Sequence, residues 1–552
     1  MYSDKENINI LTALLLAHGV RHAVVCPGSR NAPITHNLCE AREMTCVSVT
    51  DERSAAFVAL GKAQALGEPV VVCVTSGSAL VNTLPAVVEA WYQHVPIIVV
   101  SADRPAAMIG QLQGQTMPQQ KTLEAFWAKE VSLPEPHDDV ERWYCNRLAN
   151  EALCAMKQSD GGPVHINVPI SEPLFNFTTA ELPTERRVSL MDNHLWPSEL
   201  TEEFLVSSRP MLVVGQLQCT VARRVSGAIR RLEESVVVLS EQLATCGNAP
   251  CHFDEALIGI GEQEAYKPDY IIYIGDTLVS KRAKHFLQHC HPKSCVVVNA
   301  SGELTDVTMN VTDVVVCPVE DALDSLCEKL ESGDVALGNE ASAFRGRWAM
   351  ALDKWAIRCK AFEPAYSQMM AVRRLCEQTN GQECHMQFAN SSAVRLGQLY
   401  SSHHLYVNRG VNGIEGSLST AVGFASEKDV TVYCVIGDLS FFYDQNALWN
   451  GVGKRHLRMV VLNNGGGGIF HQLRGLEQSP YRDSFVSATH TASAKGVCEA
   501  TGVAYKAASN EEELTEGISW ITRGQATEPL LLEVFTNAEI DAREYKKYLE
   551  TK

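Results

Sequence analysis

Two apolar runs of the chain end abruptly in residues that could bind a metal ion. Residues 430–436 are followed by Gly437, Asp438, Leu439 and Ser440, and residues 459–462 by Asn463, Asn464 and four glycines. An apolar run that stops at small polar residues is typical of a buried strand whose carboxyl end meets a loop. A carboxylate, an amide oxygen and a backbone carbonyl are the hard oxygen ligands that Mg²⁺ prefers, with phosphate oxygens completing the shell. The two segments therefore predict a metal–diphosphate site at the carboxyl edge of a parallel sheet.

A pair of acidic residues, Asp51 and Glu52, precedes the largely apolar residues 55–65, which have the pattern of a helix. On local evidence these acids cap the helix and favour its positive end.

Arginines follow three further strand-like runs. Arg30, which adjoins Ser29, comes shortly after residues 23–25. Arg104 follows residues 96–101, and Arg409 follows residues 405–407. The guanidinium fork matches a carboxylate, so arginines gathered at one sheet edge predict anionic substrates. Taken singly, each arginine is more typical of a solvated surface charge.

These residues must be positioned by a sheet, and the chain divides into three blocks that could supply one each. The blocks span residues 1–185, 195–335 and 365–552, with a linker at 181–187 and a polar helix over 340–361. Strand-like runs alternate with helical spacers, for example 70–75, 79–92 and 96–101 in the first block. This order predicts an α/β fold with three doubly wound parallel-sheet domains. The first and third blocks are similar in size and pattern.

The middle block offers four strand candidates, at 211–215, 236–239, 270–275 and 295–298, and the third block offers 405–407, 430–436, 459–462 and 530–535. Gly215 lacks a following G-x-x-G, so a dinucleotide fingerprint is missing.

Composition and net charge limit the kinds of molecule that the protein could bind and the compartment in which we expect it. The 552 residues carry a formal net charge of −18, which argues against nucleic acid or an anionic membrane as a general partner. No apolar run reaches the roughly 18 residues that a bilayer requires, and the first residues do not have the pattern of a signal peptide. The 18 cysteines include no C-x-x-C, so we expect reduced thiols in a cytoplasmic protein. His285 and His289 have a helical spacing that zinc could use, but no partner motif follows them.

The order of these segments resembles the thiamine diphosphate enzymes, whose signature is Gly-Asp-Gly, a spacer of this length and Asn-Asn. Here 24 residues separate Asp438 from Asn463, and Leu439 stands in place of the third-position glycine. The resemblance implies that Asp438 and Asn464 bind Mg²⁺ (or Mn²⁺) through side chains and Gly466 through its carbonyl. It places Gly437, Leu439, Ser440 and the supporting Ile414 beside the cofactor, and makes Glu52 the carboxyl that activates it. It also implies a homodimer, or a dimer of dimers, because the cofactor of this superfamily lies between the first block of one subunit and the third block of another.

Over nearly the whole chain the segments resemble one branch, the 2-succinyl-5-enolpyruvyl-6-hydroxy-3-cyclohexene-1-carboxylate synthase family of menaquinone biosynthesis. These transferases decarboxylate 2-oxoglutarate and add the succinyl carbanion to isochorismate in a 1,4 fashion. The resemblance implies substrate-binding roles for positions that match the family's motifs: Ser29, Arg30, Arg104, Gln115, Lys281, Arg282, Ser391, Arg395, Arg409, Ile469, Phe470 and Leu473.

One segment departs from the family's pattern, and two other functions stay open. Residues 465–468 are all glycine where a third asparagine is expected, and each added glycine gives the loop more conformational freedom. Another thiamine enzyme, such as an acetolactate synthase or a 2-oxoacid decarboxylase, acts on less charged partners than the arginines suggest. A non-catalytic nucleotide-binding or regulatory α/β protein would not need Glu52, Asp438 and Asn464 together.

Overall fold

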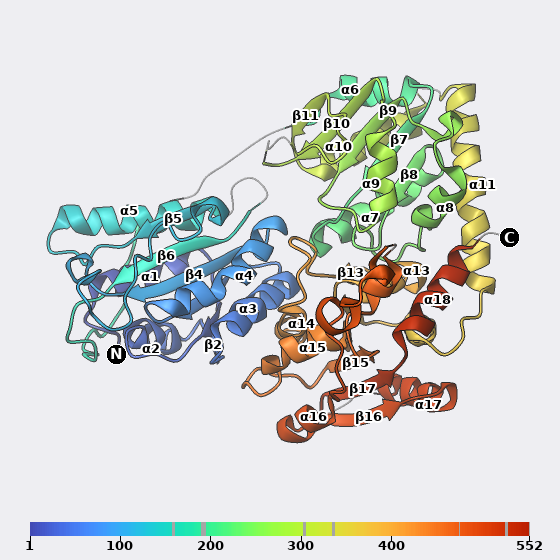
Figure 1. Cartoon of the computed structure of the whole chain (residues 1–552). Coiled ribbons are helices and arrows are strands. Elements are labelled where there is room, and N and C mark those ends of the chain that lie inside the picture. The colour runs from blue at the N-terminus through green and yellow to red at the C-terminus, as the bar shows by residue number, and fades with distance from the viewer. Residues whose placement is uncertain are drawn as a thin grey trace.

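The computed structural model describes residues 1–156, 161–188, 195–301, 305–333, 337–473, 475–524 and 528–550. Its strands form three sheets, and every strand pairing described within them is parallel. Helices cover both faces of the sheets (Figure 1). The predicted α/β fold with three doubly wound parallel sheets is confirmed. Each sheet lies within one of the three predicted ranges, whose boundaries stay a prediction. No helix in the described ranges is both long enough and apolar enough to span a bilayer.

The first sheet has six strands in the order β2-β1-β3-β4-β6-β5. They are β1 His22–Val25, β2 Thr45–Ser48, β3 Val70–Val74, β4 Ile97–Asp103, β5 Lys129–Ser132 and β6 Val164–Pro169. The helices are α1 Glu6–Ala17, α2 Ala32–Glu40, α3 Glu52–Leu66, α4 Ser78–Tyr92 and α5 Asp139–Ala155.

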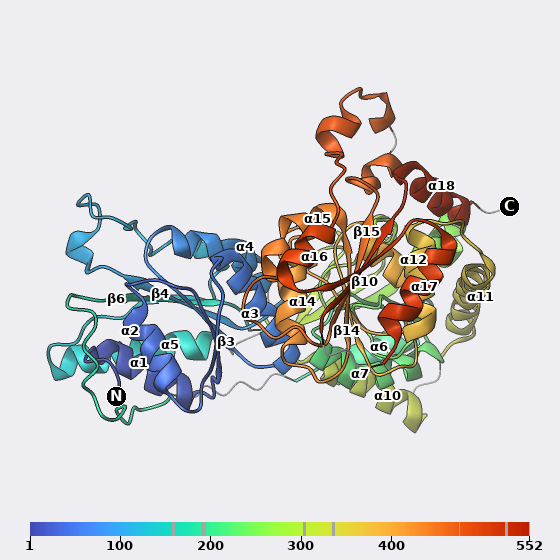
Figure 2. The ribbon, with the colours of Figure 1, turned by 90° about the horizontal axis from the view of Figure 1, so that it is seen from below.

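The third sheet repeats this topology, in the order β13-β12-β14-β15-β17-β16. Its strands are β12 His385–Phe388, β13 Leu405–Tyr406, β14 Val432–Gly437, β15 Leu457–Asn463, β16 Ala504–Ala508 and β17 Leu530–Phe535. Its helices include α12 Gln368–Thr379, α13 Ser392–Tyr400, α14 Ser417–Ala425, α15 Asp438–Tyr443, α16 Lys495–Thr501, α17 Glu511–Thr522 and α18 Ala538–Leu549. The segment near residues 476–486 projects from this domain, in orange in Figure 2.

The middle sheet has five strands in the order β11-β10-β9-β7-β8, one more than the four predicted. They are β7 Pro210–Val214, β8 Val237–Ser240, β9 Tyr270–Ile274, β10 Ser294–Asn299 and β11 Asp313–Val316. The helices are α6 Ser198–Val206, α7 Cys219–Glu233, α8 Phe253–Ile260, α9 Lys281–Gln288 and α10 Val319–Ser332, and α11 Asn339–Ala361 leads to the third domain. The unpredicted strand, β11, lies at the sheet edge and is only partly buried, although its sequence contains the short apolar run Val314, Val315 and Val316.

The first and third domains share a continuous hydrophobic core. Helices α3 and α14 cross within it, and every residue of α14 is buried. Glycines allow their backbones to touch: a Cβ at Gly61 would lie 2.0 Å from the Thr420 carbonyl oxygen, and one at Gly423 would lie 2.1 Å from that of Val58. A second core cluster joins the middle and third domains.

Candidate active site

Two adjacent strands bring the predicted metal ligands to one edge of the third sheet. Strands β14 and β15 pair in parallel, with Gly437 opposite Leu462, so Asp438 and Asn464 leave the sheet side by side. The strand order reverses between β12 and β14, and the crevice beyond such a reversal is where ligands of open α/β sheets bind.

The Asp438 carboxylate organises the glycine-rich loop. Its Oδ1 accepts a hydrogen bond from the Leu439 N–H at 2.7 Å, and its Oδ2 accepts from Gly465 at 2.8 Å and Gly466 at 3.0 Å. Burial raises the pKa of Asp438, and these N–H groups act in the opposite direction.

From the sequence, the glycines of this loop are expected to give it more conformational freedom. In the structure the loop is closely packed, and this packing requires glycine. A Cβ at Gly468 would lie 2.1 Å from Nδ2 of Asn464, and Gly466 has a φ of +154°. The Gly467 N–H donates to the Ser487 carbonyl at 2.7 Å, which holds the loop from outside. The Asn464 Nδ2 donates to Asp541 Oδ2 at 3.1 Å, so the amide oxygen is the atom left for a metal.

Unsatisfied polar atoms beside this loop fit a bound diphosphate and its cation. Nε2 of His490 is buried without a hydrogen-bond partner and lies 3.4 Å from Asp438 Oδ2, and Oγ of Ser487 is also buried without a partner. Buried polar atoms in native proteins are nearly all hydrogen-bonded, so the unpaired Ser487 Oγ is free to bind a ligand, whereas His490 Nε2 is within ion-pair distance of Asp438.

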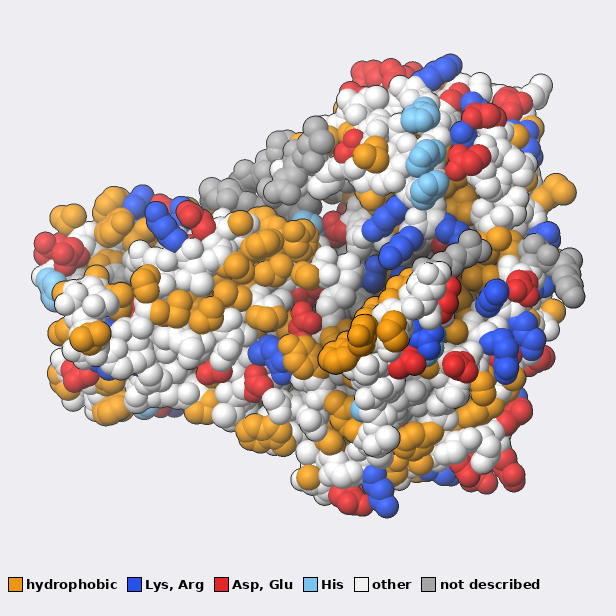
Figure 3. Space-filling view, viewed as in Figure 1, with side chains coloured by type: hydrophobic (Ala, Val, Ile, Leu, Met, Phe, Trp, Pro, Cys, Tyr) orange, Lys and Arg blue, Asp and Glu red, His pale blue; other side chains and the backbone are white. Residues whose placement is uncertain are grey.

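A cleft of about 280 Å³ lies between the middle and third domains. Among its lining residues are Lys281, Arg282, Arg395, Ile469 and Leu473, five of the predicted substrate-binding residues. Figure 3 shows Lys and Arg side chains, in blue, gathered along this hollow. A small adjoining hollow, lined by Arg395, Asn464 and Gly468 among others, connects the cleft with the glycine-rich loop.

The cations near the cleft are crowded and incompletely paired. Arg409 is 8% exposed, donates to Asn390 Oδ1 at 3.2 Å, and has a buried Nε without a partner. Burial and the neighbouring Arg395 lower the pKa of Arg409. Arg395 donates to the Ser391 carbonyl at 2.8 Å, whereas Arg282 is already paired with Asp254. Uncompensated guanidinium groups in this position fit a carboxylate ligand.

The first-domain candidates lie apart from this cleft. Arg30 and Arg104 both approach Glu172, at 3.0 Å and 3.7 Å, and Ser29 beside them is exposed. The half-buried Glu52 accepts a hydrogen bond from Asn82 of α4 at 3.1 Å. Among the described residues, no first-domain side chain lines the cleft.

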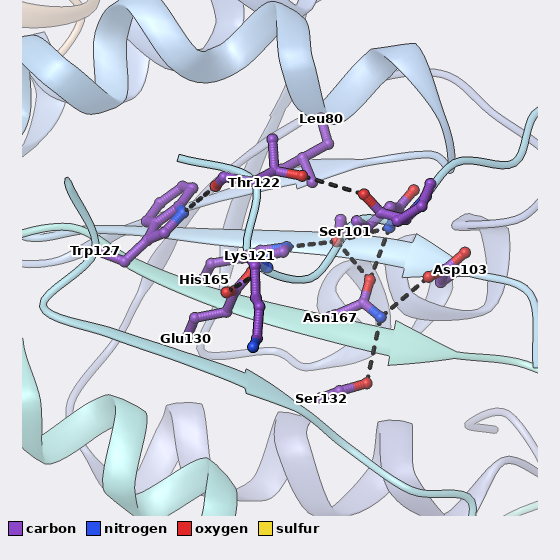
Figure 4. Close-up of polar contacts among 12 residues, drawn as sticks. Leu80, Ser101, Asp103, Lys121, Thr122, Trp127, Glu130, Ser132, His165 and Asn167 are labelled. Carbon is purple, nitrogen blue, oxygen red and sulfur yellow. Dashed lines mark hydrogen bonds and ion pairs between the residues drawn. The ribbon is translucent and has the colours of Figure 1, made fainter. Parts of the chain in front are cut away.

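A buried polar network anchors the loop that carries Arg104 and Gln115. Asn167 bridges Ser101, Ser132 and Asp103, and His165 joins Ser101 to Glu130 with 2.7 Å contacts on both ring nitrogens (Figure 4). Gln119 donates to Asn167 at 2.7 Å and accepts from the Gly77 N–H at 2.6 Å, which fixes the end of the loop.

Within one chain, two apolar residues do not lie where their predicted roles would place them. Ile414 is 44% exposed, although Ser440 Oγ donates to its carbonyl. Phe470 does not line the cleft, because its ring packs over Gly467.

Sequence reasoning missed several buried or half-buried groups around the site. Glu241, Glu255 and Tyr545 line the cleft, Asp541 orients Asn464, and His490 faces Asp438. Each becomes significant only when distant segments meet, so no local pattern could have indicated it.

Comparisons with known proteins agree with this geometry. Residues 8–124 match the thiamine pyrophosphate enzyme N-terminal TPP binding domain, and residues 389–534 match the C-terminal TPP binding domain. The chain is 42% identical to the 2-succinyl-5-enolpyruvyl-6-hydroxy-3-cyclohexene-1-carboxylate synthase of Bacteroides thetaiotaomicron, over 99% of each protein. The synthase of Phocaeicola vulgatus is 41% identical to this chain, over 100% of both chains. The synthase of Desulfotalea psychrophila is 35% identical, over 97% of this chain and 98% of its own length. The resemblance is confirmed, and the chain belongs to the 2-succinyl-5-enolpyruvyl-6-hydroxy-3-cyclohexene-1-carboxylate synthase family of thiamine pyrophosphate enzymes.

Proposed function

We propose that this enzyme decarboxylates 2-oxoglutarate with thiamine diphosphate and adds the succinyl unit to isochorismate in a 1,4 fashion. The products are 2-succinyl-5-enolpyruvyl-6-hydroxy-3-cyclohexene-1-carboxylate and CO₂, in menaquinone biosynthesis. One structural observation supports this reaction in addition to the family membership. A cleft lined by cationic side chains opens beside the loop that contains Asp438 and Asn464. Both substrates are dicarboxylates, and this cleft offers Lys281, Arg395 and the nearby Arg409 to neutralise them.

The chain's own residues would hold the cofactor through its diphosphate. Asp438, the Asn464 amide oxygen and the Gly466 carbonyl would bind Mg²⁺ or Mn²⁺, and Gly437, Leu439 and Ser440 would line the diphosphate. When bound, thiamine diphosphate would supply a nucleophilic carbon to attack the 2-oxo group and a cationic ring to accept the electrons released by decarboxylation. Glu52 would hold the proton on the cofactor's pyrimidine ring. Ile469 and Leu473 would exclude water from the reacting carbons.

A homodimer would complete the site. Glu52, Ser29, Arg30, Arg104 and Gln115 lie on the first domain and would reach the cleft of a second copy. Exposed apolar side chains on both sides support this arrangement, because such surfaces usually bind a partner: Val81, Tyr92 and Leu112 on the first domain, and Ile414, Tyr443 and Trp449 on the third. The free cysteines support a reducing compartment, and we propose the cytoplasm.

The test is to mix purified protein with Mg²⁺, thiamine diphosphate, 2-oxoglutarate and isochorismate and to follow isochorismate loss. We expect turnover that requires all four additions. Turnover with pyruvate but not 2-oxoglutarate would favour another thiamine enzyme, and absence of cofactor binding would favour a non-catalytic protein.

A further inference from the structure

A second cluster of metal-ligating side chains lies away from the proposed active site. Cys219 begins α7, Cys246 lies in the loop after β8, and His404 immediately precedes β13. One ligand atom from each residue lies within 4.8 Å of the other two. Among the described residues, this is the one group of three or more His, Cys, Asp or Glu side chains that is close enough to hold a metal ion.

One ring nitrogen of His404 lacks the hydrogen bond that its burial demands. The side chain is 8% exposed, and its Nδ1 is buried without a hydrogen-bond partner. A buried imidazole with one unpaired nitrogen, beside two sulfur atoms, points to a missing ligand.

The two cysteines can supply sulfur ligands. The Tyr406 hydroxyl donates to Cys219 Sγ at 2.7 Å. A metal ion would bind both sulfur atoms as thiolates, the form of cysteine that binds metal.

We propose that Cys219, Cys246 and His404 form a Zn²⁺ site. Two sulfur ligands and one imidazole suit tetrahedral zinc, with water or the Tyr406 hydroxyl in the fourth position. Ligand atoms around tetrahedral zinc lie about 3.5 Å apart, so atoms that lie within 4.8 Å of one another would move closer on binding. Binding would release the protons of the Cys219 and Cys246 thiols to solvent, leaving two thiolates on the metal.

One nearby cation must give way. Nη2 of Arg223 lies 3.9 Å from Cys219 Sγ and would repel an incoming metal cation. Arg223 is exposed on α7, so its long side chain can turn into solvent. Zinc with two thiolates carries no net charge, so the completed site would not repel the guanidinium strongly.

The site would tie the domains together. Cys219 and Cys246 belong to the middle domain and His404 to the third. The adjoining cavity of about 340 Å³ is also lined by Gln64 and His94 of the first domain. This cavity gives an ion a route to the cluster. Zinc here would fix the segment that leads from His404 to Arg409 at the cleft.

Cobalt provides a direct probe, because Co²⁺ bound by thiolates has an intense sulfur-to-metal charge-transfer absorption. We would titrate the reduced full-length protein with Co²⁺ in excess Mg²⁺, which occupies the oxygen-ligand site. We expect a tetrahedral cobalt spectrum at about one equivalent per chain, abolished by stoichiometric Zn²⁺. Cys219→Ser, Cys246→Ser and His404→Gln should each lose most of it. Cys384→Ser is the matched control, because Cys384 also lies beside a histidine, 3.6 Å from His403 Nε2, and should retain it.

A second measurement keeps the proposal testable if these variants fail to fold. Zn²⁺ should raise the Tm of the unmodified protein by several degrees, reversibly on adding a chelator. The proposal is overturned by a cobalt spectrum of octahedral oxygen ligation alone, by full retention of the sulfur band in the three variants, or by an unchanged Tm. A Cys219–Cys246 disulfide in protein purified without reductant and in the presence of Zn²⁺ would also overturn it, in favour of redox chemistry.

Discussion

Asp438 is the single residue on which the proposed cofactor site most depends. Its carboxylate both holds the glycine loop and would bind the metal. We predict that Asp438→Ala lowers Mg²⁺-dependent affinity for thiamine diphosphate by about 100-fold or more, measured by calorimetry. Asp429→Ala, which removes an exposed carboxylate of the same domain, is the control. Equal affinity in the two variants would remove Asp438 from the site.

Glu255, in the wall of the cleft, should make stability depend on pH. Burial, and then the neighbouring Asp254, raise its pKa from 4.5 to about 8. Between these values the folded state binds more protons than the unfolded state, so this group lowers the free energy of unfolding as pH rises.

Replacing Glu255 by Gln removes this titration. Relative to the unmodified protein, Glu255→Gln should therefore gain stability progressively from about pH 4.5 to pH 8, by up to a few kcal/mol. Urea unfolding at several pH values measures the gain, and Glu262→Gln, on the surface of the same domain, is the control. A difference that does not change with pH would contradict the prediction.

For single residues, the sequence predicts those that directly follow a strongly apolar strand. It misses those whose importance comes from contacts with residues far away in the sequence. Asp438 and Asn464 follow the most apolar runs of the third domain, so their placement was predictable. Cys219, Cys246 and His404 have no shared local pattern, and only the packing of the middle against the third domain brings them together. The zinc candidate that the sequence did offer, His285 and His289, is explained by a helix end, where His289 Nδ1 contacts the His285 carbonyl.

Among the elements, the crossing of α3 and α14 sets how the first and third domains meet. Gly423→Ala would place a Cβ 2.1 Å from the Val58 carbonyl oxygen, and backbone cannot move aside as a side chain can. We predict a loss of about 1–3 kcal/mol or more in the free energy of unfolding.

A matched glycine separates this clash from the ordinary effect of alanine in a helix. Gly346 lies in α11, and a Cβ added there would meet no other atom within 4 Å, so Gly346→Ala should be neutral or stabilise by up to about 1 kcal/mol. Chemical unfolding of both variants tests the pair. Similar changes in the two would mean that the α3–α14 crossing tolerates a methyl group.

Strongly apolar elements were predicted closely, and short or exposed ones were missed. The sequence predicts strands at 70–75 and 530–535 and a helix at 79–92, and the structure has β3 Val70–Val74, β17 Leu530–Phe535 and α4 Ser78–Tyr92. It does not predict β12 and β16. β12 has four residues, and β16 is an edge strand that is mostly half-buried, so neither leaves a clear apolar run.

For the whole molecule, the division of the candidate residues between two surfaces is the main finding. The loop that would bind the metal and the cationic cleft belong to the third and middle domains, and the acid that would activate the cofactor belongs to the first. Through the resemblance the sequence predicts these residues and also their division between two copies of the chain. Residue spacing alone could not predict this division, because it does not fix which copy of a domain meets which. A homodimer would account for both halves.

Complementation between two inactive variants tests the shared site most directly. Glu52→Gln and Asp438→Ala chains with different affinity tags are co-expressed, and the mixed dimer is purified through both tags. If Glu52 of one chain acts on the cofactor bound by Asp438 of the other, the mixed dimer contains one intact site and one doubly defective site. We predict that it consumes isochorismate at about half the rate of the unmodified dimer, while each variant alone is nearly inactive. A mixed dimer that is as inactive as its parents would contradict a shared site.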